Sequence, residues 1–229
     1  MNRWFDAFIS LFFPRCCIVC GYPLAKGEEV LCVSCNIDMP RTNLHLQKDN
    51  TVERLFWGKI PLVRATSYFY YRKGSDYCRI LFQLKYEGQK EVGEVMGRYM
   101  AAELLASGFF ATMDVIVPVP LHPKKQRSRG YNQSEWIARG VSAVTGLPVD
   151  ITSVIRHKNT ETQTRKSASQ RLENVMHIFT LLHPECFTGK HVLIIDDVLT
   201  TGATTVACAS AFQEVEGVRI SVLTMAAAD

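Results

Sequence analysis

Hydrophobic and polar residues follow one another along the chain in segments that predict strands and helices in turn. Apolar or aromatic runs typical of strands lie at 62–71, 114–119, 149–155, 176–181, 192–195 and 218–224. Segments with helical periodicity separate them at 76–86, 91–106, 134–144 and about 205–214. This alternation predicts an α/β fold in which a parallel sheet with right-handed crossovers is flanked by helices.

The run at 192–195 stands out because it is apolar on every face, which predicts a central strand buried on both sides. Asp196 and Asp197 follow at its carboxyl end, the edge where open α/β sheets bind ligands. A turn of small residues then leads into a helix, whose N-terminus and hydroxyl groups suit a phosphate. Adjacent carboxylates would repel a phosphate, so they need another partner, such as a sugar diol or Mg²⁺. The stretch therefore predicts a ribose 5-phosphate site made of Asp196, Asp197, Thr200, Thr201, Gly202, Ala203 and Thr204. An ordinary strand, turn and helix with solvated acids is the alternative.

Basic residues concentrate in one part of the chain. Between His122 and Glu173 there are ten Lys or Arg and four acids, a local charge of +6 against +4 for the whole chain. A basic loop at 121–133 follows the strand at 114–119 and brings Lys124, Arg127 and Arg129 to the same sheet edge, where arginine can hold a pyrophosphate. The polar segment at 156–174, which includes Arg156, Arg165 and Arg171, suggests a mobile lid over an anionic substrate. Lys85 either complements the end of its helix or faces a phosphate.

Two C-x-x-C pairs lie near the beginning of the chain: Cys17 with Cys20, and Cys32 with Cys35. Four thiolates in this pattern are what a tetrahedral structural Zn²⁺ requires. Gly21 and Asn36, after the second cysteine of each pair, are residue types that tolerate a left-handed turn. Disulfides are the alternative, and Cys16 is an alternative ligand. We expect the remaining cysteines to be buried rather than ligands: Cys78, Cys186 and Cys208.

The chain divides by pattern into two units. Residues 1–58 comprise an amphipathic helix ended by Pro14, the cysteine module and most of a linker at 38–61, whose apolar anchor is Leu55, Phe56 and Trp57. Residues 59–229 form the α/β domain. We expect the first helix to pack against the domain, with a membrane or partner contact as the alternative.

No apolar run is long enough for a membrane span, and the first residues lack a signal-peptide cleavage site. The sequence therefore predicts a cytoplasmic protein without a transmembrane segment, for which a homodimer is one open arrangement.

The stretch HVLIIDDVLTTGAT lacks the Walker and G-x-G-x-x-G patterns and resembles the phosphoribosyl pyrophosphate (PRPP) signature of type I phosphoribosyltransferases. The whole chain resembles the competence ComF family, which includes GntX-like proteins. The matching motifs are C-x-x-C-G, L-K-Y-x-G, V-P-V-P-L-H-P, R-G-Y-N-Q, T-x-T-Q-T-R, Q-R-x-x-N-V and I-D-D-V-x-T-T-G-A-T. This resemblance implies a type I phosphoribosyltransferase-like sheet with a small N-terminal zinc module. It also implies PRPP binding with Mg²⁺ and a link to the uptake of single-stranded DNA beside a helicase-like partner.

The resemblance assigns roles to the candidate residues. The 5-phosphate would lie on Thr200–Thr204, and the ribose hydroxyls on Asp196 and Asp197, with Mg²⁺ bound there directly or indirectly. The basic residues would neutralise the departing pyrophosphate. Catalysis would consist of positioning the reactants and stabilising the charge on the leaving group. The implied PRPP-binding residues include Lys85, Lys124 and Arg127, and the implied catalytic residues are Asp196, Asp197, Arg129 and Arg171.

Two functions of different classes stay open at this point. One is phosphoribosyl transfer to an acceptor with release of pyrophosphate, although no hood for reading a base is evident in the sequence. The other is a non-catalytic module that binds PRPP or a nucleotide and uses its zinc module and basic loops to hold single-stranded DNA. A purely structural adaptor would leave Asp196 and Asp197 without a role.

Overall fold

The computed structural model describes residues 14–157 and 178–228. In this part of the chain, four strands form one parallel sheet in the order β1-β6-β5-β2, so that β5 is central as predicted. All four side chains from Val192 to Ile195 are fully buried. The strands are β1 (Leu62–Tyr71), β2 (Val115–Pro118), β5 (His191–Leu199) and β6 (Arg219–Ala228).

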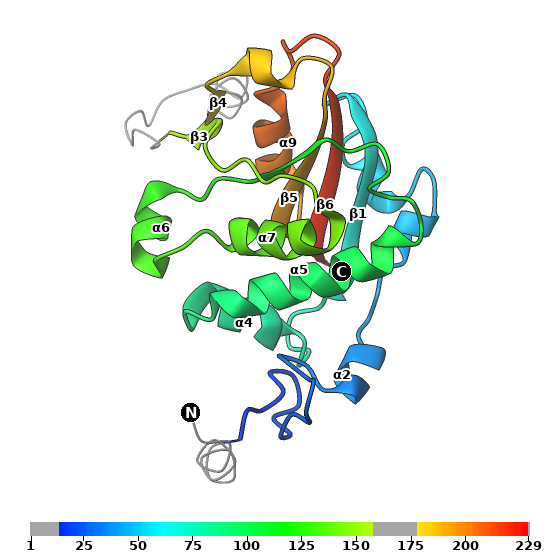
Figure 1. The fold of residues 1–229 in the computed structure, drawn as a ribbon, viewed down its shortest axis with the longest axis vertical. Coiled ribbons are helices and arrows are strands. Elements are labelled where there is room, and N and C mark those ends of the chain that lie inside the picture. The colour runs from blue at the N-terminus through cyan, green and yellow to red at the C-terminus, as the bar shows by residue number, and fades with distance from the viewer. Residues whose placement is uncertain (1–13, 158–177, 229) are drawn as a thin grey trace.

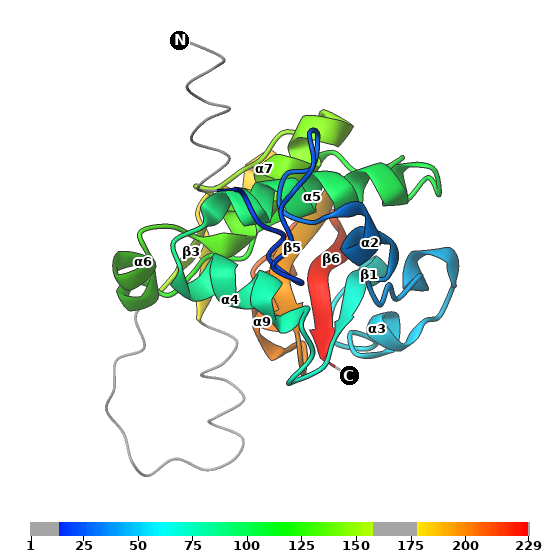
Figure 2. The ribbon, with the colours of Figure 1, turned by 90° about the horizontal axis from the view of Figure 1, so that it is seen from below.

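Helices cover both faces of the sheet, as Figures 1 and 2 show. One face carries α4 (Cys78–Tyr86), α5 (Lys90–Leu105) and α7 (Gln133–Thr145), whose apolar residues pack on Leu193, Ile195 and Leu223. The opposite face carries α3 (Thr51–Arg54), the 3-10 helix η2 (Pro184–Phe187) and α9 (Ala203–Ser210). The predicted α/β class, a parallel sheet flanked by helices, is therefore confirmed.

The helices α5 and α7 cross at glycine. A Cβ atom at Gly97 would collide with the Ile137 carbonyl oxygen, and one at Gly140 would collide with the Glu94 carbonyl oxygen. Glycine at both positions lets the two backbones touch, which fixes α7 against the sheet. The N-terminus of α7 thereby lies next to the end of β5.

The segment predicted as a linker at 38–61 is folded. It contains the 3-10 helix η1 (Leu44–Leu46) and α3, which begins in a capping box: the Asn50 side chain accepts from the Glu53 N–H at 3.0 Å, and the Glu53 carboxylate accepts from the Asn50 N–H at 3.2 Å. Of the predicted apolar anchor, Phe56 is fully buried whereas Trp57 is 52% exposed. The cap thus makes part of this polar segment helical, and Phe56 anchors the segment in the core.

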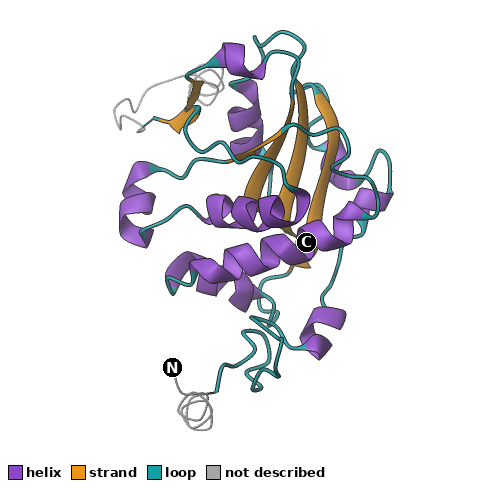
Figure 3. Ribbon diagram, in the orientation of Figure 1, coloured by secondary structure: helices purple, strands orange, loops and turns teal. Residues whose placement is uncertain are grey.

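Two predicted strands do not join the parallel sheet. Val149 forms only an isolated bridge with Ile116, because Asp150 accepts from the backbone N–H groups of Thr152 and Ser153, both at 2.8 Å, and turns the chain. The strand that follows, β3 (Val154–Arg156), pairs antiparallel with β4 (Phe179–Leu181) in a separate small sheet (Figure 3).

The basic segment predicted as a loop contains a short helix, α6 (Pro123–Arg129), which stands away from the sheet in Figure 1. Pro123 occupies its first turn, the His122 side chain caps it, and Gly130 ends it with φ +82°. The predicted first helix and most of the predicted lid, with Arg165 and Arg171, lie outside the described residues.

Candidate functional site

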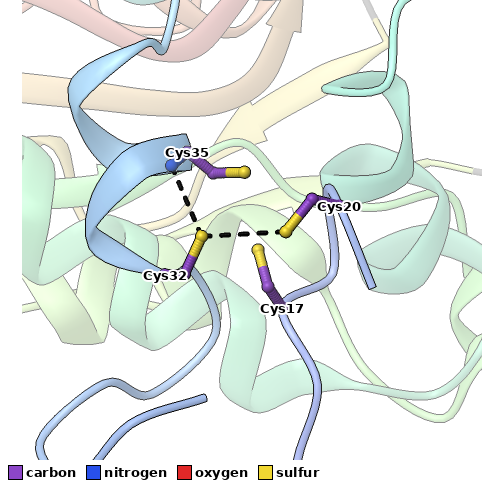
Figure 4. A group of neighbouring side chains, drawn as sticks. All are labelled: Cys17, Cys20, Cys32 and Cys35. Carbon is purple, nitrogen blue, oxygen red and sulfur yellow. Dashed lines mark hydrogen bonds between the residues drawn. The ribbon is translucent and has the colours of Figure 1, made fainter. Parts of the chain in front are cut away.

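The cysteine module brings four thiols together. The Sγ atoms of Cys17, Cys20, Cys32 and Cys35 all lie within 4.8 Å of one another, and Figure 4 shows the side chains converging. The Cys20 and Cys32 sulfurs are 3.7 Å apart. Because a tetrahedral Zn²⁺ with bonds of about 2.3 Å separates its sulfurs by about 3.8 Å, the cluster is compatible with structural zinc.

The two knuckles of the module differ. Gly21 takes the predicted left-handed conformation with φ +77°, and its N–H donates to the Cys17 carbonyl at 2.8 Å. The same expectation for Asn36 was wrong, because Asn36 lies inside the helix α2 (Val33–Ile37), where its N–H donates to the Cys32 carbonyl. A helix N-terminus therefore replaces the second turn, and the Cys35 N–H points at the Cys32 sulfur at 3.4 Å.

Local donors favour a thiolate at Cys17, whereas burial and the neighbouring thiols raise the pKa of Cys35. Burial raises the pKa of the Cys17 thiol, but N–H groups of Cys20, Cys32 and Val19 outweigh it and bring that pKa down to about 7. The alternative ligand Cys16 is not in the cluster, because its thiol is exposed and turns to the Pro14 carbonyl. Cys208 is buried as expected and Cys78 partly buried, whereas the prediction for Cys186 was wrong, since it is exposed.

The second site lies where β5 extends beyond the end of its neighbour β2. The last residue of β2, Pro118, pairs with Ile195, and β5 continues through the two carboxylates to Leu199. A pocket of about 170 Å³ therefore forms beside Asp196 and Asp197. Its other lining residues come from β5 itself and from six further segments: Lys85, Val119, Pro120, Leu121, Lys125, Arg129, Asn132, Gln133, Ser134, Arg156, Val198 and Thr204.

The two carboxylates have different partners. Asp196 accepts from the Ser134 hydroxyl at 3.0 Å and from the Asp197 N–H at 2.9 Å, whereas Asp197 pairs with the Lys85 ammonium at 3.1 Å. Burial and the adjacent Asp197 charge raise the pKa of Asp196 to about 7, against the effect of these donors. The pair therefore favours a ligand that brings hydroxyl donors or positive charge.

The turn after β5 has the conformation of a helix start. Gly202 has φ +74° and precedes α9, and the Thr201 hydroxyl approaches the Ala203 N–H at 3.4 Å. Thr200, Thr201, Ala203 and Thr204 are exposed, and the first N–H groups of a helix have no intrahelical acceptors. The turn therefore presents donors to solvent next to the two carboxylates.

The predicted basic residues separate into two groups. Lys85 and Arg129 line the pocket, where the Lys85 ammonium pairs with the Asp197 carboxylate. Lys124 and Arg127 are exposed on α6 and do not line it. Arg171 lies outside the described residues.

Sequence reasoning missed residues at the start of α7. Gln133 is 1% exposed, its Oε1 accepts from Arg129 at 2.7 Å, and its Nε2 has no hydrogen-bond partner among the described residues. Asn132 caps α7 and donates to the Val119 carbonyl at 3.0 Å, which anchors this corner. The motif R-G-Y-N-Q was the signal that could have identified them.

Arg156 also reaches the pocket, although from β3 rather than from a lid. Its guanidinium stacks 5.3 Å from the centre of the Phe179 ring, and its Nε has no hydrogen-bond partner among the described residues. Gln133 and Arg156 thus give the pocket two buried donors without acceptors, which points to an oxygen-rich ligand.

None of the described helices is both long and apolar enough to cross a membrane.

Comparison with known proteins finds two kinds of relative, a DNA utilization protein and competence proteins. The chain is 28% identical over 214 residues to the DNA utilization protein YhgH of Escherichia coli (strain K12), and the alignment covers 85% of this chain and 88% of that protein. It is 37% identical over 92 residues to Competence protein F of Haemophilus influenzae, 40% of each chain, and 33% identical over 90 residues to Competence protein ComFC of Bacillus subtilis, 39% of this chain and 34% of that one. The chain is thus similar to the DNA utilization protein over most of its length and to the competence proteins over about two fifths of it. The family resemblance read from the motifs is thereby confirmed.

No family model matches the chain. Among solved structures, the glutamine PRPP amidotransferase from B. subtilis aligns with a TM-score of 0.42 at 18% identity, over 62% of this chain and 30% of that one. Adenine phosphoribosyltransferase from Leishmania tarentolae aligns with a TM-score of 0.35 at 14% identity, over 78% and 88%.

Proposed function

We propose that the pocket at the carboxyl end of β5 binds PRPP, and that the protein transfers the phosphoribosyl group to an acceptor with release of pyrophosphate. The observation that supports this most is the meeting of two adjacent carboxylates, a threonine-rich helix start and four cationic side chains in one pocket. A ribose diol suits the carboxylates, and a phosphate suits the helix start.

Each group has a part in this proposal. Asp196 and Asp197 accept hydrogen bonds from the ribose hydroxyls, while Thr200–Thr204 hold the 5-phosphate. Arg129 and Arg156 stabilise the charge that develops on the departing pyrophosphate, and Gln133 Nε2, which has no partner in the described part of the chain, donates to one of its oxygens. Lys85 leaves Asp197 for a phosphate when the ligand binds. Lys124, Arg127 and Arg171, assigned to the same ligand from the sequence, are proposed as outer contacts that neutralise it as it enters.

Mg²⁺ fits this donor set, because carboxylates and phosphate oxygens are the ligands that it prefers. When bound with PRPP, Mg²⁺ would neutralise charge on the pyrophosphate group. For the cysteine cluster we propose structural zinc, held by Cys17, Cys20, Cys32 and Cys35. With all four positions taken by sulfur, such a site holds the chain together rather than binding substrate.

Calorimetric titration with PRPP and Mg²⁺ tests the pocket. We expect the native protein to bind, and the Asp196→Asn, Asp197→Asn variant to lose at least about tenfold in affinity, since charge-assisted hydrogen bonds contribute about 1.5–3 kcal/mol each. Glu214→Gln, Glu216→Gln is a matched control, because it also removes two negative charges, both exposed and at the opposite end of the sheet. If the folded native protein does not bind PRPP, the proposal is wrong.

The names of the relatives favour a second function, a non-catalytic module that engages single-stranded DNA beside a helicase-like partner. Those proteins are called DNA utilization and competence proteins. The exposed cations of α6 would then follow a phosphate backbone, and binding would weaken steeply with salt. Pyrophosphate release in the presence of a nucleobase would support the transferase. Salt-sensitive strand binding that survives loss of both carboxylates, without turnover, would support the module.

A further inference from the structure

Two aromatic side chains of α4 project beside the pocket. Phe82 is 51% exposed and Tyr86 is 67% exposed, and they lie one helical turn apart on the same side of α4. Their ring centroids are 5.4 Å apart at an interplanar angle of 43°. They therefore form one exposed aromatic surface, which we call the α4 aromatic face.

Positive charge surrounds this face. The Arg129 guanidinium lies 5.4 Å from the centre of the Tyr86 ring, and its bond to Gln133 at 2.7 Å holds it there. Lys85, between the two aromatic residues in sequence, reaches Asp197 at 3.1 Å. A hollow of about 450 Å³ lined by Lys85, Tyr86, Gly88, Lys125, Ser128 and Arg129 runs along the cations.

The face is also continuous with the pocket at the end of β5. A second hollow, of about 420 Å³, is lined by both aromatic residues together with Lys85, Asp197, Val198 and Thr200. Lys85, Asp197 and Val198 line the β5 pocket as well. A flat group on the aromatic rings would thus lie directly beside the two carboxylates.

Charge and shape together favour one occupant. Exposed aromatic rings interleaved with Lys and Arg are the arrangement with which proteins stack unpaired bases while they hold phosphates. An apolar partner helix would have to bury the charges of Lys85, Lys125 and Arg129, which is costly.

We propose that the α4 aromatic face binds a nucleobase by stacking, next to the carboxylates of β5. The inference rests on the proposed function, because it supplies the base-binding surface that a phosphoribosyl acceptor or a single strand would need. A free base and a base within a strand share this chemistry, so the experiment distinguishes the two sources.

The test uses fluorescence anisotropy with a labelled oligothymidine and with an abasic strand of the same length, which keeps the phosphates and lacks the bases. We expect the native protein to prefer oligothymidine, and Phe82→Ala, Tyr86→Ala to lower this preference at least about fivefold, the lower end of what one stacked base contributes. Competition by the free nucleobases identifies the source. If they displace oligothymidine from the native protein and not from the variant, the face accepts free bases; if only strands compete, it accepts a base within a strand.

Two further variants keep the test decisive. Phe82→Leu, Tyr86→Leu retains apolar bulk without the flat rings, so it should lose the preference while it preserves the fold. Trp57→Ala removes an aromatic ring of similar exposure, 52%, which also has a guanidinium over it, that of Arg54 at 5.9 Å from the ring centre. This variant should bind as the native protein does.

The inference is wrong if the native protein does not distinguish the two strands and binds no free base, or if both Phe82/Tyr86 double variants keep the native preference. A parallel titration of the native protein with PRPP separates this failure from that of the proposed function. A base preference that depends on Phe82 and Tyr86, without PRPP binding, would contradict the proposed function and leave the aromatic face established.

Discussion

The cysteine cluster and the β5 pocket are built in opposite ways. The four thiols come from residues 17 to 35, two short segments that are close together in the chain. The pocket collects residues between Lys85 and Thr204, from α4, α6, α7, β3, β5 and α9. The cluster thus depends on short-range geometry, whereas the pocket depends on the topology of the whole sheet.

This difference has an energetic counterpart. Cys17, Val19, Leu31 and Cys35 belong to the same buried cluster as α4 and α5, so that loss of the module opens the core. Asp196 and Asp197 are adjacent carboxylates of like charge, which a fold tolerates for binding rather than for stability. Substitutions in the two regions should therefore affect stability in opposite directions.

The largest effect is expected at the cysteine cluster. Cys17→Ser should release bound zinc and lower the melting temperature by about 10 °C, which corresponds to roughly 4 kcal/mol for a chain of this size. Metal analysis and calorimetric melting measure both. Cys16→Ser is the matched control, because the adjacent Cys16 thiol is exposed and outside the cluster. Full metal content in Cys17→Ser would contradict the assignment of the ligands.

The same contrast explains what the sequence could predict. The cluster followed from spacing alone, because C-x-x-C pairs impose their own geometry. The central strand followed from Val192–Ile195, and its carboxyl end from Asp196 and Asp197. The order of the strands was not predictable, since hydrophobic periodicity says nothing about which strands pair.

Individual errors had local polar causes. Asp150 turned a predicted strand by accepting two N–H groups, and Asn50 made a helix in a predicted linker. Lys125, Gln133 and Arg156 reach the pocket only through the placement of α6, α7 and β3, so charge patterning could not separate them from Lys124 and Arg127.

A second prediction concerns Asp196, where stability should rise. Asp196→Asn keeps an acceptor for the Ser134 hydroxyl and the Asp197 N–H but removes the charge that burial and Asp197 disfavour, raising the pKa of Asp196 to about 7. At about pH 8 we expect a gain on the order of 2 kcal/mol in urea unfolding, together with weaker PRPP binding. A loss of stability would show that the carboxylate supports the fold, contrary to the comparison.

The opposite end of β5 provides a third prediction. The buried His191 ring contacts the Thr112 carbonyl through Nδ1 at 3.0 Å and the Ser221 hydroxyl through Nε2 at 2.9 Å. Since a carbonyl only accepts, Nδ1 carries the proton and Nε2 accepts. Burial, followed by the charge of Arg219, lowers the pKa of His191, so the folded state binds fewer protons than the unfolded state.

Protonation of Asp196, whose pKa is raised to about 7, has the opposite effect on stability over the same range, so the test uses the Asp196→Asn background. In that background, stability should fall as the pH drops below about 6.5, by about 1 kcal/mol between pH 7 and about 5.5. Urea unfolding at several pH values measures this slope. His183→Gln should leave it unchanged, because His183 is exposed, and His191→Asn should flatten it. An unchanged slope in His191→Asn would assign the pH dependence to other groups.

The smallest effect is expected at an exposed ion pair that connects the cysteine module to α5. Arg98 of α5 pairs with Glu29 of the cysteine module, and their side chains are 30% and 47% exposed. Such a surface pair contributes about 0.2–1 kcal/mol, so Glu29→Gln should lower stability by no more than about 0.5 kcal/mol. The effect should shrink further in salt, which urea unfolding at two ionic strengths measures.

The Arg41–Glu103 ion pair provides a comparison for the Arg98–Glu29 pair. Arg41 also joins the module to α5, through Glu103 at 2.6 Å, but it is more buried and donates in addition to the Asn36 carbonyl at 2.5 Å and to the Tyr68 hydroxyl at 3.1 Å. Arg41→Met would leave the Asn36 carbonyl unpaired and the Glu103 carboxylate with only the Tyr68 hydroxyl as a donor, and should cost about 3 kcal/mol. If Glu29→Gln cost as much, the module would be attached by surface charge rather than by its buried contacts, and the contrast between the two regions would need another cause.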